Sequence, residues 1–226
     1  EASLKAGALG LSTSLGRGYA LAAKDHELER LLSLIKGRDK LVTHHLENEG
    51  AGIVAAVSRV VSLSRASGAK SHISHFKVLG KKSWPKQKTA LEIIERARAG
   101  GVELTIDFFP YTATGSDLYL LLPEWAIVGA QDEILGRLSD ADTGAKIISA
   151  LKSMTLHYDK IIIASTLKDT NIAGRSLKTI SDDAGLSPEE AILKILLTND
   201  LQVSIFNEVI SEENLFEIAR KDYAAI

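Results

Sequence analysis

The fold is indicated most clearly by two short segments, Leu41-Val-Thr-His-His-Leu-Glu-Asn-Glu-Gly50 and Ser71-His-Ile-Ser-His-Phe-Lys77. Each places a histidine, His45 in the first and His75 in the second, where an apolar, strand-like run gives way to polar residues. The histidines are separated by about thirty residues, the length of one strand-helix-strand unit, so the sequence predicts that they end neighbouring parallel strands. Neutral imidazole is the commonest protein ligand for metal ions. The two segments therefore predict a metal site at the ends of two strands.

The same pattern extends to both sides of the two histidines. Apolar residues recur every three or four positions in three stretches, which predicts helices over 24–36, 52–67 and 87–99. Further strands are predicted over 7–13 and 102–107. Four strands that alternate with helices are typical of a parallel α/β sheet or barrel.

The composition permits a large core and excludes several classes of protein. The chain has 226 residues, of which 45% are hydrophobic, enough for one or two domains. A net charge of −2 gives no general attraction to nucleic acid or to an anionic membrane, and no apolar run reaches the roughly eighteen residues of a membrane span. The absence of cysteine excludes disulfides and thiolate metal ligands within this chain. We expect a cytoplasmic protein without nucleic-acid or membrane partners.

After Tyr111 the regular alternation of strands and helices is interrupted. Helices are predicted near 132–138 and 143–152, and the apolar run 161–164 is short enough for a strand. A structureless loop of this length is uncommon in compact domains. We therefore expect residues 112–170 to form a small α/β insertion, which serves either as a lid over the site or as structural support.

Two capped helices and a strand follow the insertion. Ser187 precedes a proline and two acids, and Ser211 precedes two acids, which is typical of helix starts. The stretch 201–206 between these helices predicts a strand. We expect residues 1–111 to form the central part of a barrel and residues 171–226 to return to it.

Several short segments are informative through their order and spacing along nearly the whole chain. The segments are Gly7–Thr13, His45–Gly50, Ile73–Lys77 with Gly80 and Trp84, Asp107–Ala113, Leu122–Ala126, Ile161–Ser165, Gly174–Leu177 and Ser187–Ile192. Together they resemble the N-acyl-D-amino acid deacylases, or D-aminoacylases, of the metal-dependent amidohydrolase superfamily. The resemblance implies a partial (β/α)8 TIM barrel, of which this chain holds about strands four to seven together with the small α/β insertion.

The resemblance also implies a zinc-dependent hydrolase that acts on a small linear amide such as an N-acyl-D-amino acid. In this family His45 would end the fifth strand and His75 the sixth, and both would bind zinc. Lys77, two residues beyond His75, would hold the carboxylate of the substrate, with a surface lysine as the alternative. Tyr111 would hydrogen-bond the substrate or anchor its own loop. Asp107 would orient a histidine or face solvent.

Two histidines leave the zinc site incomplete, because a catalytic zinc usually has three protein ligands. In the family the remaining groups are a His-x-His pair, a cysteine and the aspartate that transfers the proton. No histidine precedes His26, cysteine is absent, and the sequence ends at Ile226 without the aspartate motif. We therefore expect a central fragment of a longer enzyme, with no catalytic residue of its own and no activity in isolation.

Strand alternation separates two other histidines from the expected ligands. Successive side chains of a strand face opposite sides of the sheet. His44 is therefore expected opposite His45, and His72 opposite His75. Both are expected to pack in the core or to support the ligands.

Three departures from the family pattern leave the substrate open. Glu47 stands where an arginine is usual, Phe109 where the family has a tyrosine, and Gly115 where a serine is common. Each change weakens the recognition of a carboxylate. A cyclic-amide hydrolase of the dihydroorotase kind is therefore an alternative, and so is a non-catalytic barrel relative that serves as a binding or scaffold module. The sequence does not fix the acyl group, the stereochemistry or the oligomeric state.

Overall fold

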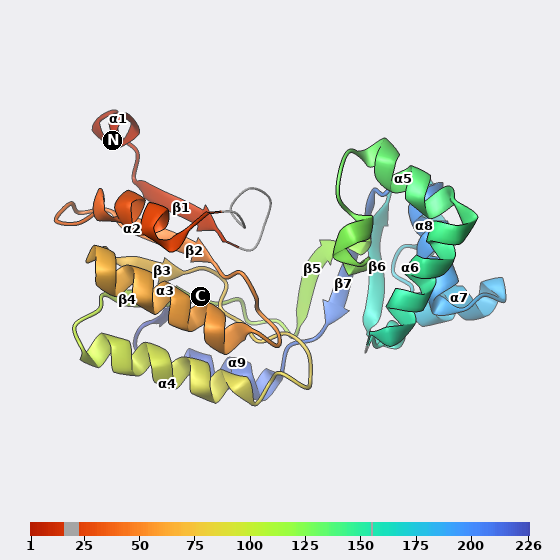
Figure 1. Ribbon diagram of the computed structural model, residues 1–226. Helices are drawn as coiled ribbons and strands as arrows, with labels where there is room; N and C mark the ends of the chain where they lie inside the picture. Colours follow the sequence, from red (N-terminus) through yellow and green to blue (C-terminus); the bar gives the residue numbers. More distant parts are fainter. Residues whose placement is uncertain (16–22, 155) are drawn as a thin grey trace. The chain divides into compact units, whose positions relative to one another are not determined.

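The computed structural model describes three stretches of the chain, namely residues 1–15, 23–154 and 156–226. The described residues divide into two compact units (Figure 1). The first unit combines residues 1–112 with 210–226, and the second consists of residues 113–209.

The chain returns to the first unit at Ile210 rather than at residue 171. Strand β7 (Val203–Glu208) lies between β5 (Ala113–Asp117) and β6 (Ile161–Thr166) and pairs with both of them. This pairing joins the segment before Ile210 to the second unit. Because the pairing is long-range, the periodicity of the sequence does not reveal it.

The first unit alternates strands with helices, as the sequence predicts. Its elements are α1 (Ala2–Lys5), β1 (Gly10–Ser14), α2 (Asp25–Ser33), β2 (Leu41–His45), α3 (Ile53–Ser67), β3 (Ser71–Ile73), α4 (Lys86–Ala99), β4 (Leu104–Asp107), α9 (Glu212–Ala219) and β8 (Ala224–Ala225). The strands form one parallel sheet in the order β1-β2-β3-β4-β8. The parallel α/β sheet is therefore confirmed, and the short β8 adds a strand that was not predicted.

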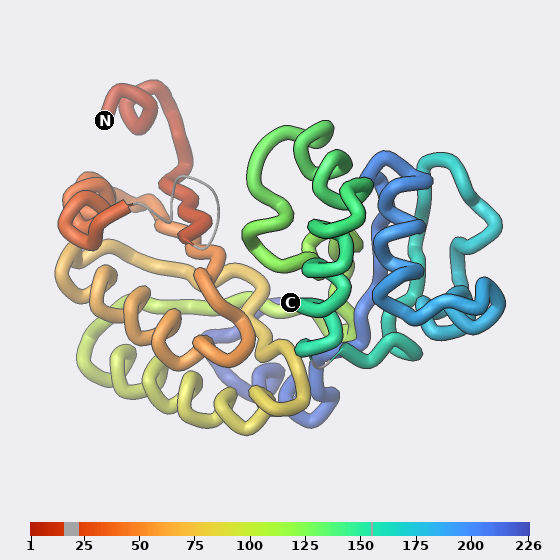
Figure 2. The backbone as a smooth tube through the Cα atoms, turned by 45° about the vertical axis from the view of Figure 1, so that its right-hand side comes forward, coloured from red at the N-terminus to blue at the C-terminus, as the bar shows by residue number. Residues whose placement is uncertain are grey.

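The helices α2, α3 and α4 lie over one face of this sheet (Figure 1). Figures 1 and 2 show α3 and α4 side by side. A hydrogen bond of 2.7 Å joins Ser64 Oγ of α3 to Ser71 Oγ of β3. The helix ends at Gly68, whose φ of +64° lies in the left-handed region that glycine adopts without a steric penalty.

Side chains alternate between the two faces of the sheet. The face under the helices carries buried side chains, namely Val42, His44, Ser71, Ile73, Leu104 and Ile106. The opposite face, which we call the site face, carries Thr43, His45, His72, Thr105 and Asp107. Register places Thr43, His72 and Thr105 side by side across β2, β3 and β4. The site face is more accessible and more polar than the face under the helices.

The second unit packs four helices and several 3-10 turns with an antiparallel sheet in the order β5-β7-β6. Its other elements are η2 (Leu118–Leu121), η3 (Glu124–Ala126), α5 (Gln131–Ser139), α6 (Ala141–Ser153), η4 (Tyr158–Lys160), η5 (Thr170–Ile172), α7 (Leu177–Ala184) and α8 (Pro188–Thr198). A separate apolar core holds it together and includes Leu118, Ile147, Ile163 and Ile192, each 0% exposed. This unit therefore buries its own core, which is expected of a domain.

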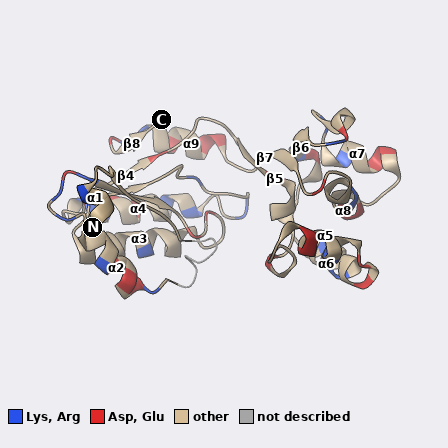
Figure 3. Cartoon of the chain, turned by 90° about the horizontal axis from the view of Figure 1, so that it is seen from above, with Lys and Arg blue, Asp and Glu red and all other residues tan. Residues whose placement is uncertain are grey.

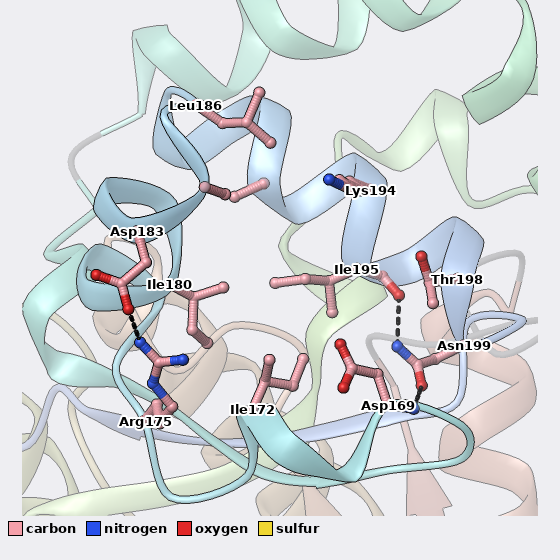
Figure 4. A pocket seen from close by; sticks show the side chains of 12 residues that line it. Asp169, Ile172, Arg175, Ile180, Asp183, Leu186, Lys194, Ile195, Thr198 and Asn199 are labelled. Atoms are coloured by element: carbon pink, nitrogen blue, oxygen red, sulfur yellow. Dashed lines mark hydrogen bonds and ion pairs between the residues drawn. The ribbon is translucent and has the colours of Figure 1, made fainter.

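A hollow of about 270 Å³ lies in the second unit between η5, α7 and α8 (Figure 4). Apolar side chains such as Ile172 and Ile195 form its floor. The ion pair between Arg175 and Asp183 lies on one side of it. None of the residues that the sequence predicts for the metal site lines this hollow.

Charged residues of both signs occur in each unit (Figure 3). This distribution agrees with the net charge of −2.

Among the described residues, no helix combines the length and the apolar character needed to cross a membrane.

Candidate metal centre

His45 and His75 lie side by side on the site face. His45 is the last residue of β2, and His75 follows the end of β3 by two residues. Nδ1 of His45 and Nε2 of His75 are 2.8 Å apart, and the two rings meet edge to face with their centroids separated by 4.5 Å. The rings therefore meet, as the spacing of the two segments predicts.

The two nitrogens converge in a way that suits a zinc ion. Zinc–nitrogen bonds of about 2.0–2.1 Å at a tetrahedral angle require the nitrogens to lie about 3.4 Å apart. The separation of 2.8 Å is shorter by roughly half an ångström, so the ring pair must open by about that much to hold the ion. One carboxylate, that of Glu49, completes a cluster whose candidate ligand atoms lie within 4.8 Å of one another.

Glu49 contacts His75 on the side of the ring that faces away from His45. Its Oε1 lies 3.0 Å from Nδ1 of His75, whereas Nε2 of the same ring faces His45. A protonated Nδ1 that donates to Glu49 leaves Nε2 with a free lone pair, which is the tautomer that a metal needs. Glu49 is therefore better suited to accept a hydrogen bond from a metal-binding histidine than to bind the metal itself as a third ligand.

The loop after β2 fixes the position of Glu49. Oδ1 of Asn48 accepts hydrogen bonds from the backbone nitrogens of Gly50 and Gly52, at 3.0 and 2.9 Å. The backbone oxygen of Glu49 accepts one from Leu79, at 2.7 Å. The sequence pattern predicts no role for Glu49, although an acid four residues after a strand-end histidine is an available signal.

Lys77 is buried beside Glu49. Its side chain is 7% exposed, and Nζ lies 2.5 Å from Oε1 of Glu49, whose side chain is 12% exposed. Burial raises the pKa of Glu49, but the hydrogen bond from His75 and the charge of Lys77 outweigh burial and hold the pKa below its ordinary value. The alternative of a surface lysine is therefore wrong. The ammonium group also occupies the space next to Nδ1 of His75, at 3.0 Å, so that side of the ring is closed to a metal cation.

Asp107 ends β4 and contacts both histidines of the second segment. Its carboxylate accepts a hydrogen bond from the backbone N–H of His75 and lies 2.7 Å from Nε2 of His72. Nδ1 of His72 lies 2.8 Å from Oγ1 of Thr105. The alternative in which Asp107 orients a histidine is confirmed.

His72 and His75 do not face opposite sides of the sheet, so this expectation is wrong. β3 ends at Ile73, and His75 lies beyond it with φ at +42°, in the left-handed region. Strand alternation therefore stops before His75. His72 shares the site face with His45.

His44 faces the helices, opposite His45, as predicted. It is 0% exposed, and Nδ1 lies 2.8 Å from Oγ1 of Thr13, while Nε2 has no hydrogen-bond partner among the described residues. Burial and the neighbouring His72 lower the pKa of His44 to about 4. His44 is therefore a neutral core residue at pH 7.

The remaining residues singled out in the sequence lie around this cluster. The guanidinium of Arg59, on α3, binds the carboxylate of Glu47 and also that of Asp25, at 2.8 Å, so the charge of Glu47 is compensated. The ring of Phe109 lies 5.7 Å from Nζ of Lys77, measured to the ring centroid. Tyr111 follows on the same loop and is 67% exposed.

Gly115 lies on β5, in the second unit, opposite Phe206 of β7.

The chain matches curated deacylases over about half of its length. It is 37% identical over 123 residues to N-acyl-D-glutamate deacylase and 28% identical over 113 residues to D-aminoacylase, both from Alcaligenes xylosoxydans xylosoxydans. The matched stretches cover 54% and 50% of this chain, but only 25% and 23% of those proteins. No protein-family model matches the chain.

Solved structures of the same kind cover nearly the whole chain. The N-acyl-D-glutamate deacylase from Bordetella bronchiseptica, solved with zinc and a phosphonate inhibitor, aligns with a TM-score of 0.73 and 25% identity over 99% of this chain. A D-aminoacylase structure described as having a binuclear metal centre aligns with a TM-score of 0.68 and 21% identity, which supports the fold alone. This chain covers 39% of each of these two. The matches confirm the resemblance to the D-aminoacylase family.

Proposed function

We propose that His45 and His75 are zinc ligands of a metal-dependent amidohydrolase that cleaves a small linear amide such as an N-acyl-D-amino acid. The observation that carries this proposal is the convergence of Nδ1 of His45 and Nε2 of His75, at 2.8 Å, from the ends of neighbouring parallel strands. Catalytic groups of barrel enzymes lie at the carboxyl ends of their strands. Of the two curated relatives named above, one is an N-acyl-D-glutamate deacylase by name and the other a D-aminoacylase, which supports the substrate class.

We also propose that the first unit is part of a (β/α)8 barrel. Its parallel strand order and the helices on one face of the sheet support this arrangement. The second unit is inserted between β4 and α9 of that barrel.

The residues of this chain then have distinct roles in the reaction. His45 and His75 hold the zinc, which when bound supplies Lewis-acid activation of water and of the substrate carbonyl. Lys77 provides the positive charge that attracts an anionic substrate, with its own charge partly balanced by Glu49. Tyr111, exposed on the loop after β4, donates a hydrogen bond to the substrate. The proton-transferring aspartate is not among the residues assigned here.

The test of this function compares substrates on the full-length protein that carries this sequence. We expect hydrolysis of acylated D-amino acids and none of cyclic amides such as dihydroorotate. Turnover of cyclic amides alone would contradict the proposed reaction. Absence of any turnover together with absence of bound zinc would favour a binding or scaffold role.

A matched pair of lysine variants tests the role of Lys77. We expect Lys77→Met to lower kcat/KM for anionic N-acyl amino acids more than for their neutral amides, since only the anion meets the lysine charge. Lys70→Met is the control, because the ion pairs of Lys70 among the described residues, with Asp39 and Glu103, are long, at 3.6 and 3.7 Å. Equal losses for both substrates would remove the proposed role.

A further inference from the structure

We propose that Asp107 and Glu49 are positioning residues that together hold His75 in its metal-binding conformation, one through the backbone and the other through the ring. This inference rests on the proposed function, because it assigns His75 a metal to bind. Neither carboxylate is itself required to touch the metal.

The backbone of His75 needs external support. Its φ of +42° lies in the left-handed region, which costs a residue with a Cβ roughly 1 kcal/mol or more relative to the right-handed region. Such a conformation persists only where the surrounding structure over-determines it. His75 also lies past the end of β3, so the ladder between strands does not fix it.

Asp107 supplies that support from the neighbouring strand. Its side-chain Oδ1 accepts the N–H of His75, and its backbone oxygen accepts the N–H of Phe76, at 2.7 Å. Two consecutive backbone N–H groups are therefore held by one residue. A hydrogen bond to a charged acceptor is stronger than one to a neutral acceptor, which suits a carboxylate at this position.

His72 holds Asp107 in turn. Nε2 of His72 lies 2.7 Å from Oδ2 of Asp107, while Nδ1 lies 2.8 Å from Oγ1 of Thr105. With the Thr105 hydroxyl donating to Nδ1, the N–H at Nε2 donates to the carboxylate. The two oxygens of Asp107 thus have separate partners, and its carboxylate cannot rotate without losing both.

Glu49 fixes the ring rather than the backbone. Its Oε1 lies 3.0 Å from Nδ1 of His75, and it is itself held by Nζ of Lys77 at 2.5 Å. The backbone and the ring of His75 are thereby held from two different places, the end of β4 and the loop after β2. Carboxylates that hold metal-binding histidines in this way typically contribute about 10- to 100-fold to metal affinity.

The experiment measures two properties of the full-length protein that are independent of turnover. The first is the rate at which a chelator removes zinc. The second is the hydrogen-exchange rate of the His75 backbone amide in the metal-free protein. We expect Asp107→Ala to increase the rate of zinc removal and the rate of amide exchange by at least about 10-fold each. The His75 amide loses its hydrogen-bond acceptor, and the backbone of His75 is then no longer fixed. Asp107→Asn keeps an oxygen acceptor for His75 and is expected to stay within a few-fold of wild type.

One control and a second variant of Asp107 accompany this experiment. Asp39→Ala removes an exposed aspartate whose only described ion pair, to Lys70, measures 3.6 Å, and it is expected to match wild type. Should Asp107→Ala fail to fold, Asp107→Glu displaces the same carboxylate by one methylene and is expected to show the faster zinc loss and exchange. Wild-type values for both measurements in a folded Asp107→Ala or Asp107→Glu protein would overturn the role of Asp107.

The ring contact is tested by a second matched pair. We expect Glu49→Ala to speed zinc removal by about 10-fold or more while leaving exchange at the His75 amide near wild type. Glu47→Gln, in the same loop but bound to Arg59, is expected to leave zinc removal unchanged. An unchanged zinc rate in Glu49→Ala would overturn its role. If wild-type protein bound no zinc, the proposed function would fail, whereas the amide exchange would still decide whether Asp107 holds the backbone.

Discussion

Oε1 of Glu49 and Nζ of Lys77 lie 2.5 Å apart, with the two side chains 12% and 7% exposed. An ion pair removed this far from water is costly to break, because the remaining charge keeps its burial and loses its partner. The same pair lies directly behind His75. Breaking this ion pair is therefore expected to lower the stability of the first unit and to change the position of His75 in the candidate metal centre.

The Glu49–Lys77 pair is expected to show strong non-additivity in a double-mutant cycle. Lys77→Met alone should lower the free energy of unfolding by about 3 kcal/mol, since it leaves the buried carboxylate of Glu49 without its cationic partner. Glu49→Leu combined with Lys77→Met should cost less than either single change, because no buried charge remains. Urea unfolding of the metal-free full-length protein measures all three. Strictly additive losses would show that the two side chains do not act as a pair.

Glu95 is expected to stabilise the C-terminal segment in a pH-dependent way. Its Oε1 accepts from Nζ of Lys221, at 2.7 Å, and from the hydroxyl of Tyr223, at 3.3 Å, which joins α4 to the segment that follows α9. The hydrogen bond from Lys221 lowers the pKa of Glu95 below its ordinary value of 4.5. A lowered carboxyl pKa stabilises the folded state above pH 4.5, and the gain disappears as the pH falls through the folded-state pKa.

The corresponding variant is Glu95→Gln. Since Glu95 is 44% exposed, the loss at pH 7 should be at most about 1 kcal/mol, and it should disappear at a pH below the folded-state pKa of Glu95. Denaturant unfolding at the two pH values measures the difference. A loss of equal size at both would show that the charge of Glu95 does not contribute.

The helix α8 is expected to depend on its capping box. Oγ of Ser187 accepts the backbone N–H of Glu190, and Oε2 of Glu190 accepts that of Ser187, at 2.8 Å. Ser187→Ala should therefore destabilise the second unit by about 1 kcal/mol. Ser165→Ala, at an exposed position of β6, is the control and should change little. Hydrogen exchange at the first turn of α8 measures the effect locally, and unchanged protection there would contradict it.

Most helices follow from local sequence. The stretches 52–67 and 87–99 show the apolar spacing that α3 and α4 then bury, and Ser187 marks the start of α8 through its own side chain. Each of these signals lies within one or two turns of the helix that it predicts. Local chemistry is therefore enough to place them.

Long-range pairing explains the elements that were missed. β5 has the sequence Ala113-Thr-Gly-Ser-Asp117, without apolar alternation, and it becomes a strand because β7 pairs with it. The same pairing moves β7 into the second unit, which shifts the end of that unit to Val209. Neither effect has a local signal.

The candidate site also combines features that the sequence predicts with features that depend on long-range contacts. The meeting of His45 and His75 follows from the spacing of two strands, and the buried lysine follows from its place after His75. The role of Glu49 and the early end of β3 depend on contacts between loops, which no periodicity encodes. Sequence reasoning therefore predicts that the two histidines meet and that Asp107 orients a histidine, but it does not predict the contact of Glu49 with His75.

The histidine pair is tested directly by the zinc content of the full-length protein and of its His75→Ala variant, measured by elemental analysis after dialysis. With His45 and His75 as ligands, wild type should retain about one tightly bound zinc per chain, and His75→Ala should lose it while remaining folded. His26→Ala, which removes an exposed histidine on α2, should keep it. Retention of stoichiometric zinc by folded His75→Ala would contradict the assignment of this histidine pair as a metal centre.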